Sequence, residues 1–171
     1  MGRIVELATG FPGYDARIPA SCGMLPAALV PEGYAAWAIG KWHLTPEDEL
    51  HEGAARHRWP LGRGFERFYG FFDGEAHQFG PALVSDNHLT QQPRAYEDGY
   101  HLTEDLADHA IAYVHDLRSA DPDKPFFASF CPGACHSPHQ SPPEWRERYL
   151  GRFDEGWDLW RDETFARQKA M

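Results

Sequence analysis

Two short apolar runs, each followed closely by glycine and polar residues, constrain the fold of this chain more than any other feature. The first run spans Tyr34 to Ile39 and stops at Gly40, and the second spans Phe126 to Cys131. Apolar runs of about four to eight residues that are bounded by turn residues are typical of buried strands. We therefore expect two buried strands, each of which ends in a polar cluster.

The segment between the two runs contains the clearest helix of the sequence. Thr103 is the predicted N-cap, because Glu104 and Asp105 follow in the first turn, where the positive end of the helix dipole favours acidic side chains. Apolar residues then recur at helical spacing and predict one buried face: Leu102, Leu106, Ala110, Val114 and Leu117. The turn-forming segment Asp121–Pro125 is expected to end this helix.

Shorter elements and long loops are expected elsewhere. Met24–Val30 predicts a short helix limited by Pro31, and a last helix is expected from Trp157 onward. Between Pro46 and Gln92 turn residues stand among aromatics without a sustained period, which indicates loop. The order strand, loop, helix, strand predicts an α/β fold with a mixed, mostly parallel sheet and flanking helices. Ligands of such sheets bind beyond the carboxyl ends of the strands, where both polar clusters fall.

Length and charge restrict the number of domains and the class of partner. A chain of 171 residues suits one domain, or part of one. Its formal net charge of −10 offers no footprint for a phosphate backbone or an anionic lipid surface, so neither nucleic acid nor membrane is an expected partner. Apolar stretches such as Ala35–Ile39 are also far shorter than the roughly 18 residues that suggest a membrane span.

The N-terminal sequence and the cysteines bear on the cellular compartment. The first residues lack the basic region and apolar core of a secretory signal. Cys22, Cys131 and Cys135 form an odd and sparse set, unlike the disulfide framework of a small secreted domain. Reduced thiols are expected, which favours the cytoplasm over the periplasm and leaves the compartment open.

The first polar cluster is Gly40-Lys41-Trp42-His43. Lys41 and His43 stand two residues apart, so in an extended segment both side chains would point to the same side. A cation and an imidazole placed together in this way suit an anion. The alternative is a pair of ordinary surface groups at the end of a strand.

The second polar cluster runs from Cys131 to His139 and contains prolines and a glycine that favour an irregular loop. It concentrates four groups able to bind metal or transfer protons: Cys131, Cys135, His136 and His139. Common zinc patterns use cysteine pairs two to four apart with a distant second pair, which this spacing matches only loosely. We therefore predict no metal site in this chain.

Several sequence strings together resemble the type I sulfatases, specifically the bacterial arylsulfatase branch. In chain order they are Gly40-Lys41-Trp42-His43-Leu44 after Pro31-Glu32-Gly33-Tyr34, Arg63-Gly64-Phe65-Glu66-Arg67, Gly99-Tyr100-His101-Leu102-Thr103, Lys124-Pro125-Phe126-Phe127 and Ala134-Cys135-His136-Ser137-Pro138-His139. The resemblance extends over essentially the whole chain. It implies an alkaline-phosphatase-like α/β fold and hydrolysis of a small-molecule sulfate ester.

The resemblance also implies site residues and cofactors. In the family, the formylglycine-generating enzyme oxidises a cysteine of a Cys-x-Pro/Ala-x-Arg motif to formylglycine, and Asp and Asn residues bind calcium beside it. By their strings, Lys41 and His43 would contact the formylglycine hydroxyls and the sulfate oxygens. His136 would lie on a sulfate oxygen or near the leaving group. His139 in the same string, and His77 in the loop Asp73–Phe79, are the candidate substrate-binding residues.

Departures from the family pattern concern the nucleophile and the metal. None of the three cysteines begins a Cys-x-Pro/Ala-x-Arg motif, and Asp86-Asn87-His88 precedes the Ala-x-His-x-Pro string, whereas the metal-binding pair of the family follows it. Residues 1–171 are therefore expected to be an internal fragment of one sulfatase catalytic domain that lacks the nucleophile motif and the metal-binding segments. Calcium and formylglycine are expected in the full-length enzyme, and the fragment alone is expected to be inactive.

Two other functions stay open on the sequence alone. One is a noncatalytic, sulfatase-like binding module that has lost its nucleophile and metal. The other is a hydrolase of the same superfamily that acts on phosphodiesters or phosphonates. The nucleophile of the complete protein would separate a sulfatase from the phosphate hydrolase, because Cys favours sulfate and Thr or Ser favours phosphate. A binding module would instead carry substitutions within the aligned nucleophile motif.

Overall fold

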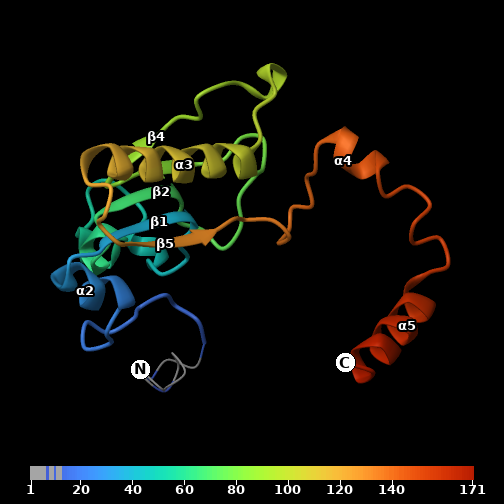
Figure 1. Cartoon of the computed structure of the whole chain (residues 1–171). Coiled ribbons are helices and arrows are strands. Elements are labelled where there is room, and N and C mark those ends of the chain that lie inside the picture. The colour runs from blue at the N-terminus through green and yellow to red at the C-terminus, as the bar shows by residue number, and fades with distance from the viewer. Residues whose placement is uncertain (1–6, 8–9, 11–12) are drawn as a thin grey trace. The chain divides into compact units, whose positions relative to one another are not determined.

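The computed structural model describes Leu7, Gly10 and residues 13–171, and the chain divides after Gln140 into two units. The first unit contains α2 (Leu25–Leu29), β1 (Ala35–Lys41), β2 (Arg67–Phe71), β3 (Leu83–Ser85), β4 (His88–Thr90), α3 (Leu102–Ala120) and β5 (Phe126–Cys131) (Figure 1). Short 3-10 turns span Val30–Glu32, Glu47–Glu49, Arg56–Arg58, Leu61–Arg63 and Tyr96–Asp98. The second unit contains α4 (Pro143–Glu147) and α5 (Trp157–Lys169).

In the described residues the strands form one mixed sheet in the order β4-β3-β2-β1-β5. Strand β1 pairs in parallel with β2 on one side and with β5 on the other, whereas β3 and β4 add antiparallel pairings beyond β2. The parallel ladders are the longer ones, and they place Gly40 between Gly70 and Cys131. This arrangement confirms the predicted α/β fold with a mixed sheet, flanking helices and long loops.

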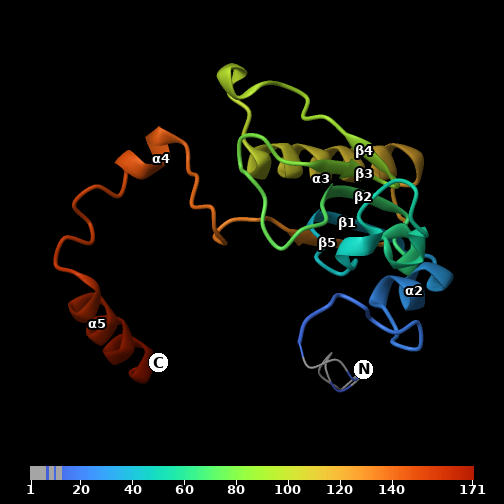
Figure 2. The same ribbon diagram turned by 180° about the vertical axis from the view of Figure 1, so that it is seen from behind.

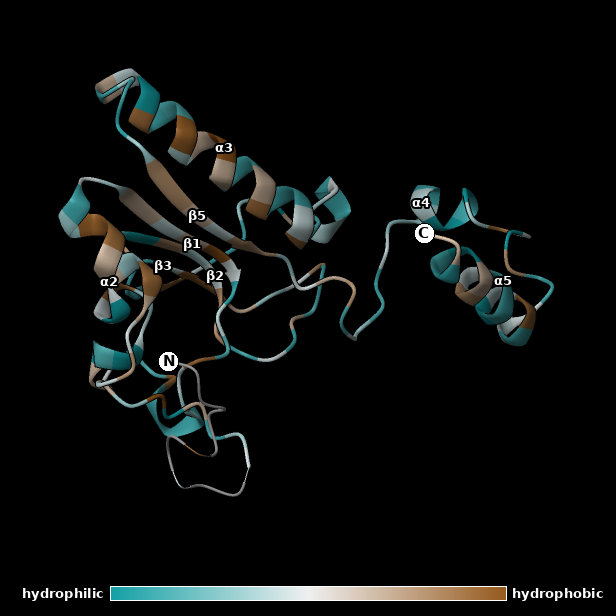
Figure 3. Cartoon of the chain, turned by 60° about the horizontal axis from the view of Figure 1, so that its bottom comes forward, coloured by the Kyte–Doolittle hydropathy of each residue, from teal (hydrophilic) through white to brown (hydrophobic). Residues whose placement is uncertain are grey.

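Strand β1 is buried on both faces and divides its side chains between two cores. Ala35, Trp37 and Ile39 pack in the cluster that includes the buried residues of α3, and Ala36 and Ala38 pack in the cluster of the opposite face. Figure 2 shows α3 along one side of the sheet and α2 on the other side. On α3 the hydrophobic and hydrophilic colours alternate along the helix in Figure 3, as expected for a helix with one buried face.

The predicted apolar face of α3 is confirmed, and its predicted N-cap is wrong. Leu102 and Leu106 are fully buried, and Ala110, Val114 and Leu117 pack against the same cluster. The N-cap lies two residues earlier than expected, at His101, whose side chain accepts a hydrogen bond from the backbone N–H of Thr103 at 3.3 Å. An imidazole therefore takes the capping role that was assigned to a hydroxyl.

The span Pro46–Gln92 is rich in loops, as expected, but it also contains β2, β3 and β4, which the sequence pattern did not indicate. Gly70 looked like a turn residue, but it lies inside β2, where it faces Gly40 of β1. A Cβ at Gly70 would stand 2.0 Å from the carbonyl oxygen of Gly40, so only glycine lets these two strands approach. Strands of three residues such as β3 and β4 carry too short a pattern to be detected without their partners.

Both predicted strands exist, with corrections to the end of one and to the burial of the other. Strand β1 does not stop before Gly40 but continues to Lys41. Strand β5 has its predicted bounds, but it is only partly buried and Phe130 is 41% exposed. Within the described residues β5 pairs only with β1 and is therefore an edge strand.

The second unit confirms the last predicted helix. Helix α5 begins at Trp157 and ends at Lys169. The residue before it, Gly156, has a positive φ of 87°. Its aromatic residues remain largely exposed, among them Trp157 and Phe165. No helix in the part of the chain that the structure describes has both the length and the apolar character needed to cross a membrane.

Candidate active site

The carboxyl ends of β1, β2 and β5 meet at one edge of the sheet, because these three strands are parallel. The chain leaves this edge in three segments, 42–46, 72–80 and 132–140. Both polar clusters from the sequence lie at this edge, as expected, on the last residues of β1 and β5 and on the segments that follow them. A Cβ at Gly40 would stand 2.0 Å from the carbonyl oxygen of Cys131, so glycine also permits the close approach of β1 and β5.

Two hydrogen bonds to its backbone fix the position of His43 at this edge. Its N–H donates to the carbonyl oxygen of Phe72 at 2.8 Å, and the Tyr14 hydroxyl donates to the His43 carbonyl oxygen. The rings of Tyr14 and His43 pack edge to face, with their centroids 4.9 Å apart. The expected extended path from Lys41 to His43 is wrong, because β1 ends at Lys41 and His43 has a left-handed φ of 50°.

Despite this turn, Lys41, His43 and His136 are close enough for their charges to interact. Burial lowers the pKa of His43 below 6.5, and the charges of Lys41 and His136 lower it further against the opposing effect of Asp73. His43 is therefore neutral at pH 7 and presents one donor and one acceptor nitrogen. Lys41 and His136 are thus each near enough to His43 to affect its pKa.

Lys41 is half-buried at the end of β1. In the described part of the chain no carboxylate lies within ion-pair distance of its ammonium group. A cation that has no counter-ion among the described residues, at the carboxyl ends of parallel strands, suits an anionic ligand.

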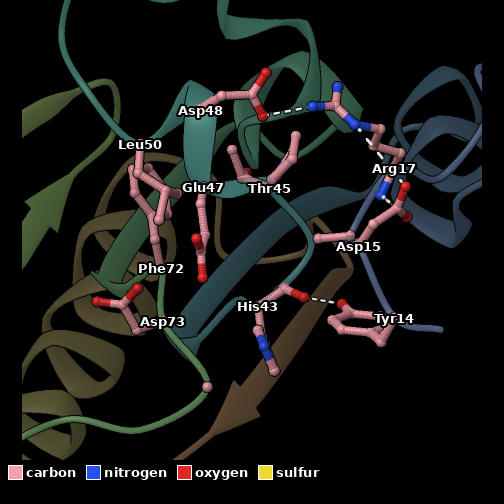
Figure 4. A pocket seen from close by; sticks show the side chains of 13 residues that line it. Tyr14, Asp15, Arg17, His43, Thr45, Glu47, Asp48, Leu50, Phe72 and Asp73 are labelled. Carbon is pink, nitrogen blue, oxygen red and sulfur yellow. Dashed lines mark hydrogen bonds and ion pairs between the residues drawn. The ribbon is translucent and has the colours of Figure 1, made fainter.

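A pocket of about 410 Å³ opens beside His43 (Figure 4). Asp73 and Tyr14 lie on opposite sides of His43 in this view, and Arg17 lies farther up the wall, with dashed lines to Asp15 and Asp48. Because Arg17 is already paired with carboxylates, it does not offer a free cation to a ligand. Lys41 and His136 do not line this pocket, which therefore extends away from the three-residue group.

His136 lies on the segment after β5, where its N–H donates to the carbonyl oxygen of Gly133 at 3.0 Å. Its Nδ1 lies 3.0 Å from the carbonyl oxygen of Ser137 and 3.7 Å from Oε2 of Glu75. The Ser137 hydroxyl donates to the same Glu75 oxygen at 2.9 Å. Glu75 thus connects the segment after β2 with the segment after β5.

The two candidate substrate-binding histidines are exposed on these same segments. Nδ1 of His77 accepts the backbone N–H of Phe79 at 3.3 Å. His139 follows His136 by three residues and has no hydrogen bond to the described residues. Neither lines the pocket beside His43. Their roles in substrate binding stay predictions.

Sequence reasoning missed Tyr14, Asp73 and Glu75. Tyr14 lies 29 residues from its partner His43, and Glu75 lies 62 residues from Ser137, so local spacing carries no sign of either contact. The available signal was the string Asp73-Gly74-Glu75 directly after an aromatic run, which placed two carboxylates near the end of a strand.

The residues of this chain do not by themselves fit the formylglycine or the calcium of the family. Cys22 is buried and its carbonyl oxygen accepts from Arg63, Cys131 and Cys135 are exposed, and none begins the required motif. Among the described residues no group of three or more His, Cys, Asp or Glu side chains is placed to hold a metal ion. Neither group therefore enters the chemistry of this chain's own residues.

Asp86 lies away from this edge and makes a hydrogen bond within the fold. It occupies the turn between β3 and β4, and its Oδ1 accepts the backbone N–H of Phe68 at 2.9 Å. Because β3 is antiparallel to β2, this turn lies beside the start of β2, whereas His43 lies beside the end of that strand.

Known proteins resemble this chain over almost all of its length. Residues 5–167 match the family model named Sulfatase. The chain is 28% identical over 186 residues to an uncharacterized sulfatase of Schizosaccharomyces pombe, covering 99% of this chain and 31% of that protein. It is 27% identical over 169 residues to an arylsulfatase of Klebsiella aerogenes, covering 95% and 34%. The chain thus spans about a third of the length of these relatives.

The fold is similar to the solved structure of Ps i-CgsB in complex with k-i-k-neocarrahexaose. The TM-score is 0.64 at 19% sequence identity, and the match covers 80% of this chain and 32% of that one. The mixed sheet and flanking helices of this chain are those of the alkaline-phosphatase-like fold. With the family model covering nearly every residue, the chain belongs to the sulfatase family.

Proposed function

We propose that this chain is part of the catalytic domain of a sulfuric ester hydrolase of the arylsulfatase type. Lys41, His43 and His136 contact the sulfate group of a small-molecule sulfate ester. The observation that carries the proposal is the half-buried Lys41, which has no carboxylate partner in the described residues and shares one edge of the sheet with the two histidines. Membership of the sulfatase family supports the reaction class.

The chemistry of these residues follows from the charge that develops during cleavage of the ester. As the bond between sulfur and the leaving oxygen breaks, negative charge accumulates on that oxygen and on the sulfuryl oxygens. A fixed ammonium group and imidazole donors stabilise this charge more in the transition state than in the bound ester. An imidazole can also donate the proton that the leaving alcohol needs, for which we assign His136.

The nucleophile and the metal belong to the complete enzyme, in which we expect formylglycine and calcium. That enzyme would need the formylglycine-generating enzyme as a partner. Because none of the three cysteines of this chain begins the motif for that modification, residues 1–171 alone are expected to lack turnover. The span of about a third of the relatives' length supports the same proposal.

The test is hydrolysis of a chromogenic aryl sulfate by the complete protein that contains this chain. Lys41→Ala or His43→Ala should lower turnover ten-fold or more, since loss of a charged transition-state contact costs at least about 1.4 kcal/mol. Lys124→Ala and His115→Ala are matched controls, because Lys124 precedes β5 at the opposite edge and His115 is exposed on α3.

Three outcomes would overturn the proposal. Wild-type turnover in both Lys41→Ala and His43→Ala would remove these residues from the site. Faster turnover of a phosphodiester than of the matching sulfate ester would assign the chain to the phosphate branch of the superfamily. Absence of turnover with tight binding of the sulfate ester would identify a binding module instead.

A further inference from the structure

Glu75 contacts two residues of the second polar cluster, Ser137 and His136. The proposed function assigns no role to these contacts. Its carboxylate lies on the segment after β2 and reaches across to the segment after β5. Oε2 accepts the Ser137 hydroxyl at 2.9 Å and lies 3.7 Å from Nδ1 of His136. Both side chains of the ion pair are more than half exposed, at 54% for His136 and 59% for Glu75. A pair this exposed contributes little to the stability of the fold.

The contacts of Nδ1 determine which nitrogen of His136 carries the proton in the neutral ring. The Ser137 carbonyl oxygen, 3.0 Å away, can only accept, so this hydrogen bond requires a proton on Nδ1. The negative charge of Glu75 on the same side of the ring favours that arrangement. Nε2 is then the nitrogen left for a ligand, and it accepts a proton or, in the protonated ring, donates one.

We propose that Glu75 is a positioning residue that fixes the ring orientation and the Nδ1–H tautomer of His136, so that Nε2 faces the sulfate ester. The proposal rests on the proposed function for the role of His136, but the tautomer itself does not depend on it. Without Glu75, the ring of a half-exposed histidine on an irregular segment would lose the cross-loop contact made through Ser137. The same tautomer logic applies to metal-binding histidines, whose distal nitrogen is oriented by an acceptor on the other nitrogen.

The experiment compares Glu75→Ala, Glu75→Gln and Ser137→Ala in the complete protein. Glu75→Ala removes the charge and the acceptor, Glu75→Gln keeps an acceptor for Ser137, and Ser137→Ala removes only the bridging hydroxyl. Glu97→Gln is the matched control, because Glu97 is exposed on the turn Tyr96–Asp98 and makes no ion pair in the described part of the chain. Each variant is assayed for kcat and KM on a chromogenic aryl sulfate. The tautomer of His136 is read separately from ¹⁵N chemical shifts of histidine-labelled protein, assigned with His136→Gln.

In Glu75→Ala, kcat should fall about ten-fold, less than the roughly 10²–10⁴-fold that a general acid or base supplies, while KM changes little. The neutral ring of His136 should shift from mainly Nδ1–H toward Nε2–H. Glu75→Gln should retain part of both properties, and Glu97→Gln should match the wild type. An unchanged tautomer in Glu75→Ala, or wild-type kcat in that variant, overturns the proposal. If the wild-type protein hydrolyses no sulfate ester, the proposed function fails, and the ¹⁵N shifts still decide whether Glu75 orients His136.

Discussion

Gly74 lies directly against the imidazole of His43: a Cβ at position 74 would stand 2.7 Å from Cε1 and 3.1 Å from Nε2 of that ring. The backbone of His43 cannot move away easily, because its N–H is bonded to Phe72 and its carbonyl oxygen to Tyr14. The ring must therefore rotate if a methyl group is added at Gly74. This contact makes Gly74 a sensitive probe of the proposed site.

Gly74→Ala should lower the turnover of an aryl sulfate by between about ten-fold and a hundred-fold, the cost of misplacing a catalytic group by about 1 Å. The melting temperature should change little, because the contact is with the end of one side chain and not with backbone. Gly23→Ala is the control, since a Cβ there would meet nothing within 4 Å. Equal activity of the two variants would show that the position of the His43 ring does not matter for the reaction.

Asp105 is a buried acceptor that joins α3 to β2, with 4% of its surface exposed. It accepts the hydroxyls of Tyr69 at 2.7 Å and Tyr100 at 2.9 Å, and its Oδ1 lies 3.2 Å from Nδ1 of His109. Asp105→Ala leaves these buried groups unpaired and should cost about 3 kcal/mol or more of unfolding free energy. Urea unfolding of the complete protein measures this loss, with the exposed Asp108→Ala on the same helix as control. A similar loss in both variants would contradict the role of the network.

The pair of Asp105 and His109 makes the free energy of unfolding depend on pH in a defined direction. Burial lowers the pKa of His109, but hydrogen bonds to Asp105 and its charge raise the pKa by more, so it lies above 6.5 in the folded protein. The contribution of His109 to the free energy of unfolding is therefore complete below about pH 6.5 and is lost as the pH rises through the raised pKa.

Asp105 acts in the opposite pH direction. Burial raises the pKa of Asp105, and hydrogen bonds from His109, Tyr69 and Tyr100 lower it by more, to below 3.8. Its contribution is present above about pH 3.8 and is lost as the pH falls through the lowered value.

Between about pH 5.5 and about pH 8.5 the wild-type protein should therefore lose more unfolding free energy than His109→Gln. Urea unfolding at the two pH values gives the comparison. Parallel curves for wild type and variant would show that His109 titrates alike in the folded and unfolded states.

The purified chain is expected to contain no stoichiometric zinc at Cys131, Cys135, His136 and His139. The spacing of these residues departs from common zinc patterns, and His136 is engaged by Ser137 and Glu75 through its Nδ1. Elemental analysis after dialysis is the direct measurement. Zinc that survives dialysis and disappears in Cys135→Ala would contradict this prediction and assign the segment to metal binding.

The 171-residue chain alone should not hydrolyse an aryl sulfate, even with calcium present and with the formylglycine-generating enzyme co-expressed. Its cations and imidazoles can orient and stabilise an attack, but none of its cysteines meets the sequence requirement for the nucleophile. The edge of β5, which has no strand partner among the described residues, and the exposed Phe130 also predict poor solubility. Multiple turnover that disappears in His136→Ala would prove this expectation wrong.

Local patterns in the sequence predicted the elements that carry a full period of their own. The apolar face of α3 repeats over five positions, and apolar runs cover all of β5 and most of β1, so these elements appear at nearly the expected bounds. Placement of Lys41, His43 and His136 at one edge followed from strand polarity, since parallel strands end on the same side. The resemblance in the motif strings gave the family, which the family model confirms.

Tertiary structure decided what depends on partners distant in sequence. Strands β3 and β4 exist because they pair beside β2, and β5 is an edge strand in the described residues although its sequence is a buried-strand pattern. The left-handed turn at His43 and its packing against Gly74 arise where two strand ends meet. Glu75 reaches Ser137 across 62 residues. Periodicity reports only which face of an element is buried, so a contact between two loops becomes visible only once the sheet has brought them together.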